Sequence, residues 1–345
     1  MMTEPSRGPE FMPGTEEELL DWLKREGIGL GTELIGDDAA ILESRESFAV
    51  TMDTQIEGVH FLAGLPPEII AERLVRVNLS DLAAMGGSPS YAFLSLSGPP
   101  DLDRKRFLKA ILDCCRRFEF RLAGGDLSGH AQTIGVLTLL GERTGSRWLE
   151  RSAARAGHGI WIGGALGEAA IGLELMRRGW CEQGAWSLGA SDVRKAPGWN
   201  PAWDVLARSC VSRYIRPVPQ LTLGCWLAGQ VAGAAMDISD GLAKDLNRLC
   251  RASAVGAEVD LAFLPVSSEY KALAEYLGLD WIRAVIQHGD DYVLLFTLPS
   301  DVKPPAEFDC FRIGQVTDSL PIEWNSKGRP LNVAAIGWDH LRLEG

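Results

Sequence analysis

Six short segments of this 345-residue chain place aspartates among glycines and apolar residues. They are residues 36–40, 51–54, 78–82, 124–126, 237–241 and 289–292. A carboxylate left unpaired in such surroundings costs several kcal/mol to desolvate. A single aspartate of this kind is ordinarily a helix cap or a turn former. Six segments together require a shared source of positive charge, and few lysines or arginines stand beside them in the sequence.

Magnesium would supply that charge, because Mg²⁺ prefers hard oxygen ligands. The ion usually takes one or two carboxylates, several waters and phosphate oxygens, so a nucleoside triphosphate would complete such a site. Glycines beside the aspartates let backbone N–H groups approach a phosphate closely. The turn at 239–242 runs directly into a predicted helix, whose N-terminus favours an anion. The sequence therefore predicts a magnesium-dependent nucleotide site.

Composition and missing motifs exclude several other classes of protein. A formal net charge of −12 argues against a nucleic-acid partner or an anionic membrane surface. The seven cysteines form no C-x-x-C pair, which argues against a zinc site or a disulfide framework and favours a reducing compartment. No apolar run approaches the roughly 20 residues that span a bilayer. There is no Gly-Lys dipeptide, hence no Walker A motif. We therefore expect a cytoplasmic protein with no nucleic-acid and no membrane partner.

Hydrophobic periodicity predicts two halves that each mix helices and strands. The expected helices of the first half are 67–85 and 104–118, and its expected strands are 48–52, 91–96 and 133–141. Gly, Arg, Ser and Ala then crowd together at 145–159. Beyond this stretch we expect a strand at 159–163, a helix from 168, a strand–turn–helix at 234–251 and a buried strand at 292–297.

A chain of this length ordinarily forms two domains. We expect an α/β (α+β) fold with an N-terminal extension and helix at 1–30, one domain at 31–148 and a second at 149–345. A tryptophan-rich segment at 179–205 fits neither pattern. Its tryptophans could form a lid or a subunit contact, or could simply pack onto the second domain.

Several motifs together resemble those of one enzyme family. In the first half they are GDDAA at 36–40, DTQIEGVHF at 53–61, VNLSDLAAMG at 77–86 and AGGD at 123–126. In the second half they are RSAARAG at 151–157, RYIRPVPQ at 213–220, MDISDGLAKDL at 236–246 and GDDYVLLFT at 289–297. The set resembles thiamine-monophosphate kinase, a member of the aminoimidazole-ribonucleotide synthetase-like superfamily.

The resemblance implies a homodimer whose N-terminal mixed sheets form a β-barrel, followed by a C-terminal α/β domain that completes the site. It implies transfer of the γ-phosphoryl group of ATP to thiamine monophosphate, with several Mg²⁺ ions. The implied metal ligands are Asp37, Thr51, Asp53, Asp81, Asp126, Asp237 and Asp240. The implied ATP contacts are Gly125, Asp126, Arg151 and Ser239, and the implied catalytic groups are Arg151, Asp126 and Asp240. The thiamine end would be contacted by His60, Asp290 and Trp338.

The chain also departs from the family pattern. Met52 stands where the family has Thr or Ser, Leu127 replaces a threonine, and Asp290 replaces a glutamate. A thioether is a poor Mg²⁺ ligand, and the shorter acid would reach less far. Two alternatives therefore stay open: an ATP-using member of the superfamily with another acceptor, and a nucleotide- or thiamine-phosphate-binding paralogue without catalysis.

Overall fold

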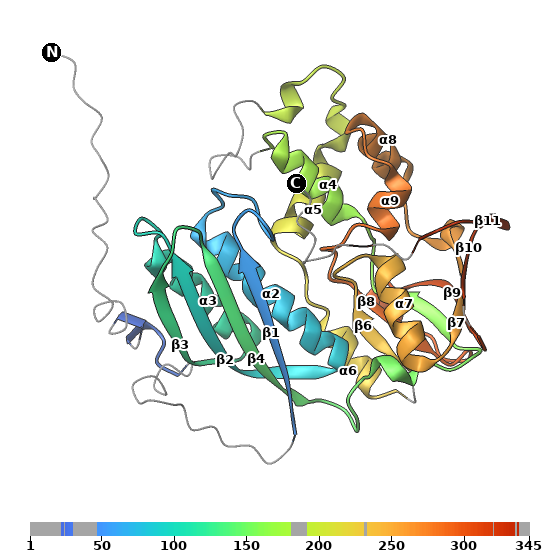
Figure 1. Cartoon of the computed structure of the whole chain (residues 1–345), viewed down its shortest axis with the longest axis horizontal. Coiled ribbons are helices and arrows are strands. Elements are labelled where there is room, and N and C mark those ends of the chain that lie inside the picture. Colours follow the sequence, from blue (N-terminus) through green and yellow to red (C-terminus); the bar gives the residue numbers. More distant parts are fainter. Residues whose placement is uncertain are drawn as a thin grey trace.

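The computed structural model describes residues 22–23, 25–29, 47–180, 192–230, 233–319, 321–334 and 337. Two predicted site residues, Asp37 and Trp338, lie outside these ranges, as does most of the predicted segment 1–30. Within the described part, two sheets stand side by side and helices pack against each of them (Figure 1).

The first half is a four-stranded mixed sheet in the order β1-β4-β2-β3. Its strands are β1 (Phe48–Ile56), β2 (Gly87–Gly98), β3 (Arg121–Gly129) and β4 (Ile134–Arg143). β1 and β2 run antiparallel to β4, whereas β3 runs parallel to β2. Helices α2 (Pro67–Met85) and α3 (Arg104–Phe118) pack together and cover one face of this sheet (Figure 1).

Both helices of the first half begin and end where the sequence predicts. α2 ends at Gly86, whose φ of 69° is left-handed and whose N–H bonds the carbonyl of Ala83. Glycine adopts this conformation without steric cost, so it is a favourable stop. α3 starts after Asp103, whose carboxylate accepts the N–H of Arg106 at 2.9 Å.

The second half is a seven-stranded mixed sheet in the order β11-β10-β7-β9-β5-β8-β6. Its strands are β5 (Gly159–Ile162), β6 (Ala235–Asp237), β7 (Gly256–Asp260), β8 (Leu294–Leu298), β9 (Phe311–Thr317), β10 (Ile322–Ser326) and β11 (Arg329–Leu331). The helices are α4 (Glu168–Arg177), α5 (Asp204–Ile215), α6 (Leu221–Ala228), α7 (Leu242–Ser253), α8 (Ser268–Tyr276) and α9 (Trp281–Ile286).

Helix α2 contacts both halves of the molecule. It packs on β1, β2, β4 and α3 on one side, and on α6 and β6 on the other (Figure 1). Its polar residues Arg73, Asn78 and Ser80 are buried along with its apolar ones. A buried polar side chain needs a hydrogen-bonding partner, so α2 is the element through which the two halves exchange specific contacts.

The two sheets divide between Arg143 and Gly159, close to the predicted boundary. The domain limits stay predictions. The dimeric barrel also stays a prediction, because the first sheet of the described chain is open. In the described part of the chain, no helix is both long enough and apolar enough to cross a membrane. The cytoplasmic location also stays a prediction.

The described tryptophans of the 179–205 segment pack against the second half. Trp199 lies 5.9 Å from Trp180, 5.6 Å from Trp203 and 5.9 Å from Tyr276 of α8, measured between ring centroids. Arg194 covers the ring of Trp180 at 4.7 Å. These contacts favour the packing interpretation of the segment, since aromatic pairs at such separations stabilise one another.

Candidate active site

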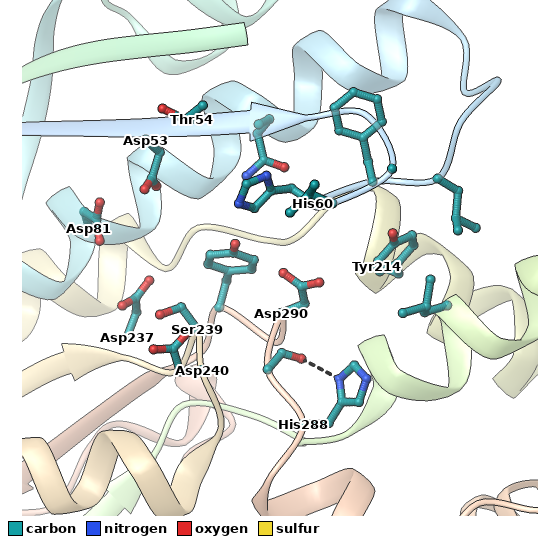
Figure 2. Close-up of a pocket in the computed structure, with 18 of the residues that line it drawn as sticks. Asp53, Thr54, His60, Asp81, Tyr214, Asp237, Ser239, Asp240, His288 and Asp290 are labelled. Atoms are coloured by element: carbon teal, nitrogen blue, oxygen red, sulfur yellow. Dashed lines mark hydrogen bonds between the residues drawn. The ribbon is translucent and has the colours of Figure 1, made fainter. Parts of the chain in front are cut away.

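A cavity of about 360 Å³ lies between the two halves of the chain. Its walls come from β1 and the turn after it, from α2, α4 and α5, from the β6–α7 turn and from the 288–292 loop. The predicted site residues that line it are Asp53, His60, Asp81, Asp237, Ser239, Asp240 and Asp290. Figure 2 shows four aspartate carboxylates toward one end, with His60, Tyr214, His288 and Asp290 toward the other.

The β1 side of the site follows from strand alternation. Thr51 and Asp53 are two residues apart, so their side chains share the face of β1 that packs on α2. The Thr51 hydroxyl donates to the Asp81 carboxylate, and the Asp53 N–H donates to the Asn78 side chain at 3.2 Å. β1 and α2 therefore place two carboxylates next to each other.

The second half contributes Asp237, which is bonded to α2, and two adjacent loops. The Ser80 hydroxyl donates to Asp237 Oδ2 at 2.7 Å. The Asp290 N–H donates to the Ser239 carbonyl and the Tyr292 N–H to the Ile238 carbonyl, both at 2.9 Å. These bonds hold the β6–α7 turn beside the 288–292 loop, which brings motifs far apart in sequence into one cavity.

Burial and mutual repulsion raise the pKa values of the clustered carboxyls. The pKa of Asp53 rises to about 7, first through burial and then through the charge of Asp81. Burial also raises the pKa of Asp81, and burial with the Asp81 charge raises that of Asp237 well above its ordinary value. Groups that repel one another in this way favour a shared cation.

The donor set fits magnesium, since it consists of carboxylate and hydroxyl oxygens. Among the described residues, no three acidic, histidine or cysteine side chains already form a metal-binding cluster. An ion that keeps waters and takes phosphate oxygens does not need a closed protein cage. Asp53, Asp81 and Asp237 are the residues that would hold it, and the metal assignments themselves stay predictions.

His60 reaches the cavity from a tight turn after β1. Glu57 and Phe61 form an isolated bridge, and the His60 N–H donates to the Ile56 carbonyl at 2.9 Å. The Ile56 N–H donates to His60 Nδ1 at 3.0 Å, so the neutral ring carries its proton on Nε2. The turn therefore fixes both the position and the tautomer of this histidine.

Asp290 is paired with an arginine that the sequence motifs do not identify. Arg73 Nη2 lies 2.7 Å from Asp290 Oδ1, and its Nε donates to Gln55 at 3.0 Å. The same guanidinium donates to the Tyr214 carbonyl. Arg73 is only 1% exposed. Arg73 shares a helix face with the apolar residues Ile69, Ile70 and Val77, and this position was the available signal for a buried functional cation.

The two aspartates of the 289–292 segment have different roles. Asp291 accepts the backbone N–H groups of Gly167 at 2.7 Å and Ala169 at 3.3 Å, at the start of α4. Burial raises its pKa to about 7. Asp291 therefore caps a helix, whereas its neighbour Asp290 lines the cavity.

Four predicted residues within the described ranges are not part of the cavity lining: Thr51, which bonds Asp81, and Gly125, Asp126 and Arg151. Gly125 and Asp126 are exposed on β3, which is separated from β1 by β4 and β2. A side chain at Gly125 would collide with the carbonyl of Leu94, so this glycine is also required for the pairing of β2 with β3. Arg151 is exposed in the short helix after β4, yet its charge reaches Asp81 and partly offsets the effect of burial on the pKa.

Comparisons with known proteins agree on one family. The model of the AIR synthase related protein, N-terminal domain, matches residues 36–142. The thiamine-monophosphate kinase of Aquifex aeolicus is 31% identical over 327 residues, covering 94% of this chain and 97% of the relative. That of Escherichia coli K12 is 32% identical over 323 residues, covering 89% and 91%. The chain belongs to the thiamine-monophosphate kinase family.

Solved structures of the thiamine-monophosphate kinase family have the same fold. AaThiL complexed with AMPPCP and TMP is 29% identical, covers 98% of this chain and 100% of its own, and has a TM-score of 0.72. The enzyme from Stenotrophomonas maltophilia K279a is 30% identical, covers 92% and 98%, and has a TM-score of 0.73. These likenesses, with the curated relatives, confirm the family and the enzyme class predicted from the motifs.

Met52, where this chain departs from the family pattern, does not affect the site directly. Met52 is 66% exposed and faces away from α2, between Thr51 and Asp53, which face it. Strand alternation makes this arrangement unavoidable. The concern that a thioether replaces a magnesium ligand therefore does not apply to the described geometry.

The raised pKa values make the stability of the metal-free protein depend on pH. A carboxyl with a raised pKa keeps its proton in the folded chain while the unfolded chain releases it, so increasing pH favours unfolding. For Asp53 this loss runs from the ordinary pKa of 3.8 up to about 7. In chelator, we expect a melting temperature at least about 5 °C higher at about pH 5 than at about pH 8. Circular dichroism melts measure the difference.

The Asp53→Asn/Asp237→Asn double variant is the matched control, because it cannot ionise at these two positions. Its melting temperature should depend less on pH, and the remaining dependence comes from groups such as Asp81 and Asp291, whose pKa values burial also raises. Since a bound cation favours the charged carboxylates, Mg²⁺ should stabilise the unmodified protein more at about pH 8 than at about pH 5. An equal pH dependence of the two proteins would contradict the assignment of the shifted groups.

Proposed function

We propose that this chain transfers the γ-phosphoryl group of ATP directly to the phosphate of thiamine monophosphate, giving thiamine diphosphate. One observation carries the proposal: Asp53, Asp81 and Asp237, from both halves of the chain, meet in a cavity whose other end holds His60 and Asp290. The relatives named thiamine-monophosphate kinase, and AaThiL with AMPPCP and TMP, support the assignment of both substrates.

Positioning and charge neutralisation account for the reaction, since phosphoryl transfer leaves little covalent chemistry for a protein. Mg²⁺, when bound, would supply positive charge to two mutually repelling phosphates. Asp53, Asp81 and Asp237 would hold that ion, and Ser239 presents the start of α7 to the nucleotide. Arg151 steadies the transferring group from the rim of the site.

The acceptor end of the cavity orients thiamine monophosphate. His60 donates from Nε2, and Asp290, held by Arg73, presents its remaining carboxylate oxygen. The acceptor phosphate has a second pKa of about 6, so it is largely ionised near neutral pH. A strong general base is therefore unnecessary, and the reaction proceeds in line without a covalent intermediate.

The direct test is incubation of the protein with Mg-ATP and thiamine monophosphate, followed by oxidation and fluorescent detection of thiamine diphosphate. Asp81→Asn removes a carboxylate from the centre of the site, so it should lower turnover about 100-fold or more. Asp101→Asn, at an exposed carboxylate in the loop after β2, is the matched control and should leave turnover unchanged. Absence of thiamine diphosphate with the unmodified protein at high concentration would reject the proposed reaction.

We also propose that two copies close their first sheets into a barrel. Val50 and Met52 are 62% and 66% exposed on the face of β1 opposite α2. In register, Val50 neighbours Leu140 and Tyr91 across the sheet, so this outer face presents adjacent apolar side chains. An exposed apolar sheet face of this kind favours a subunit interface.

Such closure would explain the position of Asp126. β1 and β3 are the outer strands of the described first sheet. If β1 of one copy meets β3 of the other, the strand that carries the partner subunit's Asp126 comes beside the strand that carries Asp53. A two-fold dimer would then contain two equivalent sites, each completed by the partner.

Subunit complementation tests this arrangement. Asp53→Asn and Asp126→Asn homodimers should each be at least about 100-fold less active than the unmodified protein. Co-expression with two different affinity tags and tandem purification isolates the mixed dimer, in which one site is intact. That dimer should have about half the activity of the unmodified dimer. A mixed dimer as inactive as its parents, or failure to recover any mixed dimer, would contradict the arrangement.

A further inference from the structure

Asp240 lines the cavity but is held by two cations from α7. Lys244 Nζ lies 2.9 Å from Asp240 Oδ2, and Arg248 Nη1 lies 2.7 Å from the same oxygen. The Asp240 side chain is only 6% exposed. This carboxylate, which the motifs assign to metal binding, therefore has its charge neutralised by the protein itself.

The helix geometry explains why both cations reach one oxygen. Lys244 and Arg248 are four residues apart on α7, so they lie on one face, and their side chains point back toward the helix start where Asp240 stands. Arg248 Nη1 has a second anchor, Asp245 Oδ1, at 2.8 Å. Asp245 in turn accepts the Asp240 N–H at 2.9 Å. Arg248 could therefore leave Asp240 while remaining bound to Asp245.

The two cations stand between the carboxylate and solvent. Lys244 is 23% exposed and Arg248 is 41% exposed, against 6% for Asp240. Arg73, another cation near the cavity, is buried in its pair with Asp290. Lys244 and Arg248 hold Asp240, which lines the cavity, so a polyphosphate bound beside Asp240 would meet their positive charges.

We propose that Lys244 and Arg248 form an exchangeable phosphate-binding pair. Without ligand they hold the Asp240 carboxylate; when a divalent cation takes that carboxylate, both side chains turn to the phosphate oxygens of the nucleotide. The exchange is charge-balanced, since Mg²⁺ replaces two single positive charges at the aspartate and these charges meet the phosphates that arrive with the ion. The inference rests on the proposed function for the identity of the nucleotide.

Two binding titrations of the Lys244→Ala and Arg248→Ala variants test the exchange. Because each cation competes with the metal for Asp240, its removal should tighten binding of Mg²⁺ alone by roughly threefold or more. Because each also binds phosphate, its removal should weaken binding of a non-hydrolysable ATP analogue with Mg²⁺ by about tenfold or more. Calorimetry measures both affinities. Arg251→Ala, at an exposed arginine farther along α7, is the matched control and should change neither.

An exchange predicts opposite changes in the affinities for Mg²⁺ and for the ATP analogue, whereas a purely structural role predicts a loss of both. The Arg248→Lys variant keeps the charge and should recover most of the affinity for the ATP analogue. Unchanged affinities in both alanine variants, or a parallel loss of Mg²⁺ and analogue binding, would overturn the proposal. Thiamine diphosphate formation by the unmodified protein is measured separately. If no thiamine diphosphate forms but the variants bind Mg²⁺ more tightly and the ATP analogue more weakly, the proposed acceptor is wrong and the exchange still holds.

Discussion

Helix α2 is buried between two sheets, and its polar side chains must therefore find partners inside the protein. Those partners lie in both halves of the chain. Arg73 pairs with Asp290 of the second half and bonds Gln55 of the first, while Ser80 donates to Asp237. Breaking a buried ion pair of this type leaves an uncompensated charge, so the halves are held in one relative position. The cavity and its carboxylates depend on that position.

The charge of the site explains the need for cations from outside the protein. Burial raises the pKa of Asp53, Asp81 and Asp237, because the fold places them where they repel one another and meet little water. Arg73 is engaged with Asp290 and the α7 pair with Asp240, whereas Arg177 lines the cavity and Arg151 acts on Asp81 from outside it. Magnesium fits this balance, since it supplies the positive charge that the carboxylates and a polyphosphate both lack.

Local sequence patterns predicted the helices of the first half and the aspartates of the cavity lining, whereas contacts distant in sequence were not predictable. Apolar spacing gave α2 and α3 with the observed ends. β3 was missed because Arg121–Gly129 lacks β-branched and aromatic residues. The role of Arg73 depends on Asp290, 217 residues away, which no local pattern reports. The outward orientation of Met52 could have been predicted, because neighbouring residues of a strand face opposite sides and Asp53 faces α2.

The most direct test of the role of α2 is the coupling energy between Arg73 and Asp290 in the free energy of unfolding. Denaturant titrations of Arg73→Met, Asp290→Asn and the double variant provide it. Arg73→Met should cost about 3 kcal/mol, because it removes a buried guanidinium and leaves the partly buried Asp290 carboxylate without its partner. The loss of unfolding free energy in the double variant should be smaller than the sum of the two single losses by at least about 1 kcal/mol. Arg73→Met within about 0.5 kcal/mol of the unmodified protein, or strict additivity, would contradict the account.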